Sequence, residues 1–140
     1  MPHDPALVAD TKAWLKKATT DLRAAELDLA GDPPLLEDLV FHCQQAAEKA
    51  LKALLTWHDE PFGKTHNLEE LGEACLRLHP TLRSLVDRAA PLTEYAWKFR
   101  YPGEQGGPTR DEAERALAIA REVISVNYVS RPATTISPGL

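Results

Sequence analysis

The chain has 140 residues, of which 44% are hydrophobic and 26% are charged, and its formal net charge is −5. This length suits one compact core, so we predict a single domain over residues 1–130. The acidic balance excludes a protein that coats nucleic acid by electrostatics alone. The apolar runs are far shorter than the ~20 residues needed to cross a bilayer, so no membrane association is expected.

The expected compartment is the cytoplasm. The first residues, Met1-Pro2-His3-Asp4-Pro5, have neither the basic nor the apolar region of a secretory signal. Cys43 and Cys75 lie in helix-like segments without metal-finger spacing, and free thiols are a simpler interpretation than a disulfide. No glycine-rich phosphate loop occurs in the sequence.

Helical periodicity predicts a first helix over residues 7–30. Its apolar side carries Trp14, Leu15, Ala18, Leu22, Ala25 and Leu29. Its opposite side carries Lys16, Lys17, Thr20 and Asp28. Gly31 follows as the expected terminator.

A second helix is predicted from Asp32-Pro33-Pro34, with Asp32 as its cap, to about Trp57. Its apolar face consists of Leu36, Leu39, Val40, Cys43, Ala47, Ala50, Leu51 and Leu54. Its polar face consists of Asp38, His42, Gln45, Lys49 and Lys52.

Three further helices are predicted. A short third helix begins after the Asn67 cap and ends before His79-Pro80. A fourth runs over residues 81–99, with a kink or break at Pro91. Thr109-Arg110-Asp111-Glu112 is a capping box for the last helix, which is apolar on two sides and therefore either central or shared with another subunit.

These elements predict an all-α fold, an antiparallel up-and-down four-helix bundle with one additional short helix. Residues 131–140 are rich in Pro, Ser and Thr, and we expect a disordered tail there.

The run Phe41-His42-Cys43-Gln44-Gln45-Ala46-Ala47-Glu48-Lys49-Ala50-Leu51-Lys52-Ala53-Leu54-Leu55 resembles the signature of the HEPN family (prokaryotes and higher eukaryotes nucleotide-binding). Three shorter segments occur at matching places. They are Trp14-Leu15-Lys16-Lys17-Ala18 with Asp21-Leu22, Lys64-Thr65-His66-Asn67-Leu68, and Phe99-Arg100-Tyr101-Pro102-Gly103. The resemblance covers about residues 8–128.

The resemblance implies a helical bundle that often dimerises and is often encoded beside, or fused to, a minimal nucleotidyltransferase. Some members are metal-independent ribonucleases and toxins, whose site uses an Arg followed four to six residues later by His. This chain departs from that pattern, because none of its five histidines follows an arginine at that spacing. The departure argues against ribonuclease activity, since the residue that would handle a proton or orient a phosphate is missing.

Two places are predicted as ligand or nucleotide sites. Arg100 and Tyr101 precede a constrained turn, and a fixed guanidinium beside a phenol suits a phosphate or a nucleobase. Lys64 and His66 precede the third helix, whose first N–H groups favour an anion. The alternatives are a salt bridge of Arg100 that anchors its loop, and a packing or capping role for His66.

A partner or dimer surface is predicted on the second and last helices. It consists of Phe41, His42, Gln45, Lys49, Lys52, Ile119 and Val126. A solvated helix face would explain the charges equally well, but it explains Phe41 less well. No catalytic residue, cofactor or metal site is predicted, because the histidines lack tight ligand spacing and Cys43 lies on the core face.

The function predicted is that of a non-catalytic accessory or nucleotide-binding module of the HEPN type, forming a homodimer and acting with a nucleotidyltransferase-like partner. A ribonuclease toxin with a non-standard site around Arg100, Tyr101 and His66 is one alternative. A structural dimeric interaction module without a ligand is the other.

Overall fold

The computed structural model describes residues 3–102 and 106–129, and within these ranges all regular structure is helical. The α-helices are α1 (Pro5–Ala30), α2 (Leu36–Trp57), α3 (Leu68–Leu78), α4 (Arg83–Ala89) and α5 (Arg110–Val129). Two 3₁₀ segments, η1 (Pro80–Leu82) and η2 (Ala90–Ala96), flank α4. The all-α prediction is confirmed for this part of the chain. Not one of the described helices combines the length and the apolar character that crossing a membrane requires.

Two helix starts follow the predicted caps. The Asn67 side chain accepts hydrogen bonds from the backbone N–H groups of Glu69 and Glu70 at the start of α3. Thr109 and Glu112 form the reciprocal capping box of α5, because the N–H of Glu112 donates to Thr109 Oγ1 and the N–H of Thr109 donates to Glu112 Oε1. Each contact satisfies N–H groups that lack a partner within their helix.

The predicted start of α2 at Asp32-Pro33-Pro34 is wrong. The helix begins at Leu36, and Leu35 stands at the cap position without a side-chain hydrogen bond. Pro34 disfavours helical backbone at Pro33. The Leu35 N–H instead donates to the carbonyl of Asp28 in α1, which ties the connection to the end of the preceding helix.

The predicted break near Pro91 is confirmed, but the α-helix is shorter than the predicted residues 81–99. The α-helical part covers only Arg83–Ala89, and the chain continues as 3₁₀ turns through Ala96. Pro91 lacks the N–H that an α-helix would use at this point, so the tighter turns replace the α-helix rather than bend it.

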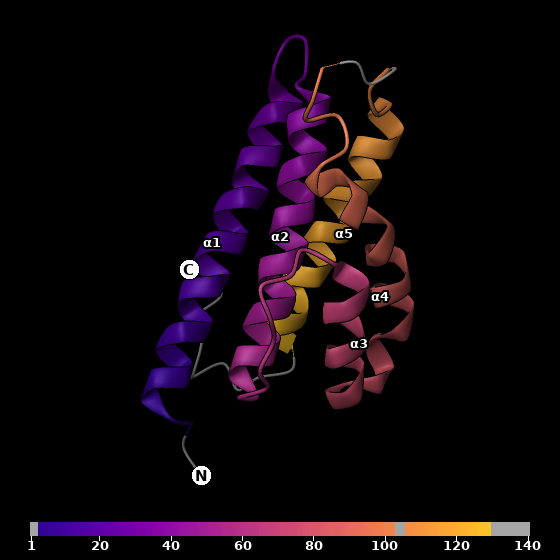
Figure 1. Cartoon of the computed structure of the whole chain (residues 1–140). Coiled ribbons are helices and arrows are strands. Elements are labelled where there is room, and N and C mark those ends of the chain that lie inside the picture. Colours follow the sequence, from indigo (N-terminus) through magenta and orange to yellow (C-terminus); the bar gives the residue numbers. More distant parts are fainter. Residues whose placement is uncertain (1–2, 103–105, 130–140) are drawn as a thin grey trace.

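No direction was predicted for the additional short helix, α3. Figure 1 shows α1 and α2 as an antiparallel pair, and it shows α3 and α5 running in the same direction as α2. The segment between α2 and α3 runs back along α2, since the Gln44 side chain donates to the carbonyl of His66 at 3.1 Å. Gln44 precedes the end of α2 by thirteen residues, so α3 begins beside the middle of α2 rather than at its end.

The main core lies between α2 and the other helices. α2 packs against α1, α3, η2 and α5, and its predicted apolar face is buried apart from the half-buried Leu36. A fully buried leucine such as Leu39 or Leu54 stabilises the fold by about 1.5–3 kcal/mol relative to an exposed one. α5 contacts α1, α2 and α4, which explains its two apolar sides within one chain.

Candidate functional site

The predicted polar face of α2 is mostly covered by other parts of the chain. Asp21 of α1 joins His42 and Lys49 of α2: its two carboxylate oxygens accept from the His42 Nδ1 at 2.9 Å and from the Lys49 ammonium. The pairing spans two turns of α2 and fixes how α1 lies on it. Asp21 itself is buried, and its charge is offset by Lys49.

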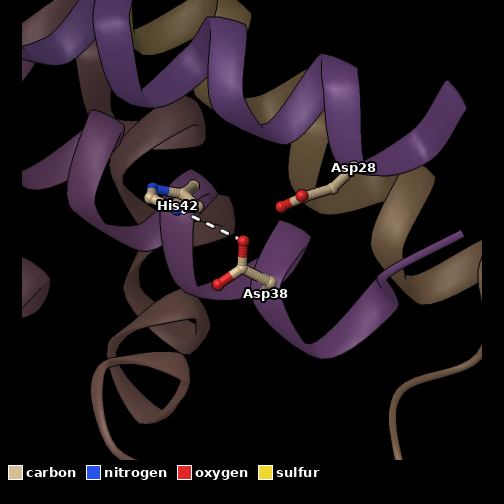
Figure 2. A group of neighbouring side chains, drawn as sticks. All are labelled: Asp28, Asp38 and His42. Carbon is tan, nitrogen blue, oxygen red and sulfur yellow. Dashed lines mark ion pairs between the residues drawn. The ribbon is translucent and has the colours of Figure 1, made fainter. Parts of the chain in front are cut away.

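Next to this pairing lies an acidic pair, Asp28 of α1 and Asp38 of α2. The second ring nitrogen of His42, Nε2, lies 3.4 Å from an Asp38 oxygen. Figure 2 shows the carboxylate of Asp28 turned toward Asp38 and His42. Asp28 was expected on the exposed side of α1, and that expectation is wrong for its carboxylate, because the Oδ2 atom is buried.

The pKa of Asp28 is raised from 3.8 to about 6. Burial is the main cause, and the nearby Asp38 side chain with its negative charge adds to it. His42 acts in the opposite direction and lowers the pKa of Asp28. The two carboxyl groups therefore lie close enough that ionisation of one opposes ionisation of the other.

A second network surrounds Glu48, which the sequence reasoning missed. Glu48 is buried, and it pairs with the equally buried Lys52 at 3.0 Å. Its other oxygen contacts the Nδ1 of His66 at 2.7 Å and the side-chain amide of Gln44 at 3.1 Å. These contacts hold the segment before α3 against α2.

Lys52 is enclosed by aromatic rings as well as by Glu48. Its ammonium lies 5.4 Å from the ring centre of Trp14 and 5.8 Å from that of Phe62. Both distances are within the range of cation–π attraction. Lys52 was predicted on the partner surface, with a solvated face as the alternative, and both are wrong at this residue, which is 7% exposed.

Arg100 and Tyr101, the first predicted ligand site, lie on the surface. The guanidinium carbon of Arg100 lies 3.9 Å from the ring centre of Phe41, so this pair stacks. Tyr101 is 73% exposed. A shallow depression beside Arg100 is also lined by Phe99, Glu37 and Asp38.

The second predicted ligand site is separate from the first. His66 contacts Glu48, whereas Arg100 contacts Phe41, and these two α2 residues are roughly 10 Å apart along the helix axis at 1.5 Å per residue. Lys64 is exposed near His66 in the chain. The structure thus brings Arg100 to Phe41 and His66 to Glu48, but it does not bring all four predicted ligand residues to one place.

The predicted surface residues of α5, Ile119 and Val126, are partly buried and pack against the core. Trp97 was assigned to a helix and was not predicted as a surface residue, yet it is 58% exposed. Its exposure depends on where η2 ends, which periodicity did not reveal.

The two cysteines are free and buried. Burial raises the pKa of the Cys43 thiol, and likewise that of Cys75, to about 12. Thiols in this state are not nucleophiles at neutral pH, in agreement with the predicted packing role of Cys43.

The HEPN domain family model matches residues 11–129 of the chain. This range contains α2, the Asp21 pairing and the Glu48 network. Comparisons with curated proteins and with solved structures gave no significant match. The chain belongs to the HEPN family, as the α2 signature indicated.

Proposed function

We propose that this chain is a non-catalytic HEPN module of the cytoplasm that acts by binding a nucleotidyltransferase-like protein. The observation that carries the proposal is the use of its histidines. None follows an arginine at the spacing of the ribonuclease site. His42 and His66, the two within the signature helix and the segment before α3, contact carboxylates that hold the fold together.

A protein-binding surface is supported by the segment that follows η2. Trp97 and Tyr101 are exposed, and Arg100 lies between them in the chain. Tryptophan, tyrosine and arginine are the residues that most often dominate binding energy at protein interfaces. Three residues of one short segment thus supply two large exposed rings and a cation already stacked on Phe41.

Nucleotide binding at Arg100 and Tyr101 is the second candidate function. The guanidinium suits a phosphate and the exposed phenol suits a base. The neighbouring depression is lined by Glu37 and Asp38, whose charges repel a phosphate. The partner protein is therefore better supported than a nucleotide.

Co-expression with the product of the adjacent gene tests the proposal. We expect a nucleotidyltransferase-like protein to co-purify with the wild type and with Arg110→Ala, an exposed arginine on α5, but not with Trp97→Glu. The same samples are incubated with RNA and titrated with ATP. RNA cleavage that is lost in Arg100→Ala would overturn the non-catalytic role, and ATP binding without any protein partner would replace the first candidate by the second.

A further inference from the structure

Three side chains from α1 and α2 converge near the turn that joins these helices. Asp28, Asp38 and His42 each offer one metal-binding atom, and these atoms lie within 4.8 Å of one another (Figure 2). The shortest defined separation is 3.4 Å, between His42 Nε2 and Asp38 Oδ2. Ligands about 2.0–2.1 Å from a tetrahedral zinc ion lie roughly 3.4 Å apart, so this separation already fits.

Two independent features distinguish this group from a surface cluster of acids. The Asp28 carboxylate faces the group, and its Oδ2 atom is buried with no hydrogen-bond partner among the described residues. An orphaned buried oxygen is costly unless a cation or proton meets it. The second feature is Asp21, which contacts the Nδ1 of His42 and so leaves Nε2 as the ring nitrogen that faces Asp38.

This arrangement of carboxylate, histidine and open nitrogen is the way proteins orient histidines that bind metals. Lys49 pairs with Asp21 and stabilises its charge. With Asp21, Asp28 and Asp38 ionised and Lys49 positive, the four groups carry a net charge of −2 (three negative charges and one positive). One divalent cation would neutralise them.

We propose that Asp28, Asp38 and His42 bind one divalent transition-metal ion of the zinc type, with Asp21 as the positioning residue. An imidazole ligand favours zinc or cobalt over magnesium or calcium. Asp38 is exposed and also lines the depression beside Arg100, so the site is open to solvent. The sequence expectation of no metal site considered spacing along the chain, which does not detect ligands contributed by two helices.

Titration of the full-length, chelator-treated chain with zinc chloride tests this site by calorimetry. His79→Gln serves as the background, because His58 and His79 lie 2.9 Å apart and form a competing pair. We expect one zinc ion per chain, and cobalt chloride should give the visible absorption bands of a tetrahedral site. Asp38→Asn should weaken zinc binding at least about tenfold, because it removes a ligand without disturbing a buried residue.

Two further variants complete the design. Glu37→Gln, at the exposed neighbour of Asp38, should bind zinc like the background protein. Asp21→Asn should weaken binding by about 10–100-fold while keeping the cobalt bands, as expected for a residue that acts through His42. Two results would overturn the proposal: equal zinc affinity in Asp38→Asn and the background, or no zinc binding in either. Asp28 and Asp38 would then share a proton instead of binding a metal ion. Neither outcome depends on the partner protein.

Discussion

At the scale of single residues, Asp28 gives the chain a defined pH dependence. Its pKa is about 6 in the folded protein and 3.8 in its ordinary state. Between about pH 4 and pH 6 the folded state therefore holds more protons than the unfolded state, and the free energy of unfolding falls as pH rises through this range. The groups that face Asp28 are Asp38 and His42 of α2, while Arg121 of α5 pairs with Glu26.

Asp28→Asn should remove this dependence, because the amide resembles the protonated acid. We expect the variant to be more stable than wild type at pH 7 by on the order of 1 kcal/mol, since solvent screens a partly exposed group. Urea denaturation at pH 4, 5, 6 and 7 with a chelator present measures it. Asp10→Asn, at an exposed position of α1, is the control, and parallel curves for wild type and Asp28→Asn would contradict the prediction.

Glu48 and Lys52 form a buried ion pair. Removing one partner should cost much more stability than replacing both. Glu48→Ala leaves the Lys52 ammonium buried without its carboxylate and should lower the free energy of unfolding by about 3–5 kcal/mol. Replacing both, as Glu48→Leu with Lys52→Met, should recover most of that loss, because no uncompensated charge remains.

The matched control is Glu114→Ala, which breaks the exposed pair of Arg110 and Glu114 with the same spacing along a helix. That change should cost less than about 1 kcal/mol. Chemical denaturation at pH 7 compares the four proteins. If Glu48→Ala and Glu114→Ala cost the same, the pair at Glu48 is solvated rather than buried.

At the scale of helices, α3 and α4 meet at a glycine. A methyl group on Gly72 would lie 2.4 Å from the Cγ1 atom of Val86, closer than carbon atoms approach in proteins. Gly72→Ala should therefore destabilise the fold by about 1–3 kcal/mol. This is opposite in sign to the roughly 1 kcal/mol that alanine gains over glycine in an unhindered helix.

The clash at Gly72 can be relieved from the other side. Val86→Ala removes the obstructing methyl groups, so the two substitutions together should cost less than the sum of their separate effects. Gly63→Ala is the control, because its added methyl would meet nothing within 4 Å. Thermal unfolding compares the variants, and strictly additive costs would show that Val86 is not the obstacle.

Local signals predicted the helices well where the deciding groups are neighbours in the chain. Asn67 and the Thr109–Glu112 box act within three residues, and both helix starts are confirmed. The start of α2 was wrong because Leu35 bonds to a carbonyl of another helix, Asp28. The course of the segment before α3 was not predicted for a similar reason, since Gln44 and Glu48, which hold it against α2, are distant from it in the chain.

The site was predicted less well, because charge on a helix surface does not reveal burial. Lys52 follows Glu48 by four residues, the spacing of an ordinary exposed pair, and only the rings of Trp14 and Phe62 remove it from water. Likewise, Asp21 and Asp28 face α2, but the pattern of apolar residues in α1 does not indicate which residues they contact. One sequence signal for such burial is a charged residue that falls at the helical spacing of the apolar core residues.

At the scale of the whole molecule, self-association and partner binding can be tested only by substitutions that do not also disturb the core. Val126 is part of the predicted dimer surface, but it packs against the core, so a charge there should unfold the monomer as well. Trp97 is exposed, and a charge at this position removes no packing of comparable extent. The two positions therefore separate loss of assembly from loss of folding.

Trp97→Glu should abolish self-association or partner binding while leaving the thermal midpoint within a few degrees of wild type. Surface substitutions usually change stability by less than about 0.5 kcal/mol. Val126→Asp should lower the midpoint sharply, because it places a charge against apolar side chains. Light scattering after size-exclusion chromatography, together with thermal unfolding, measures both properties. If Trp97→Glu still forms a homodimer, the interface does not include the segment after η2. The remaining aromatic candidate of the predicted surface is then Phe41.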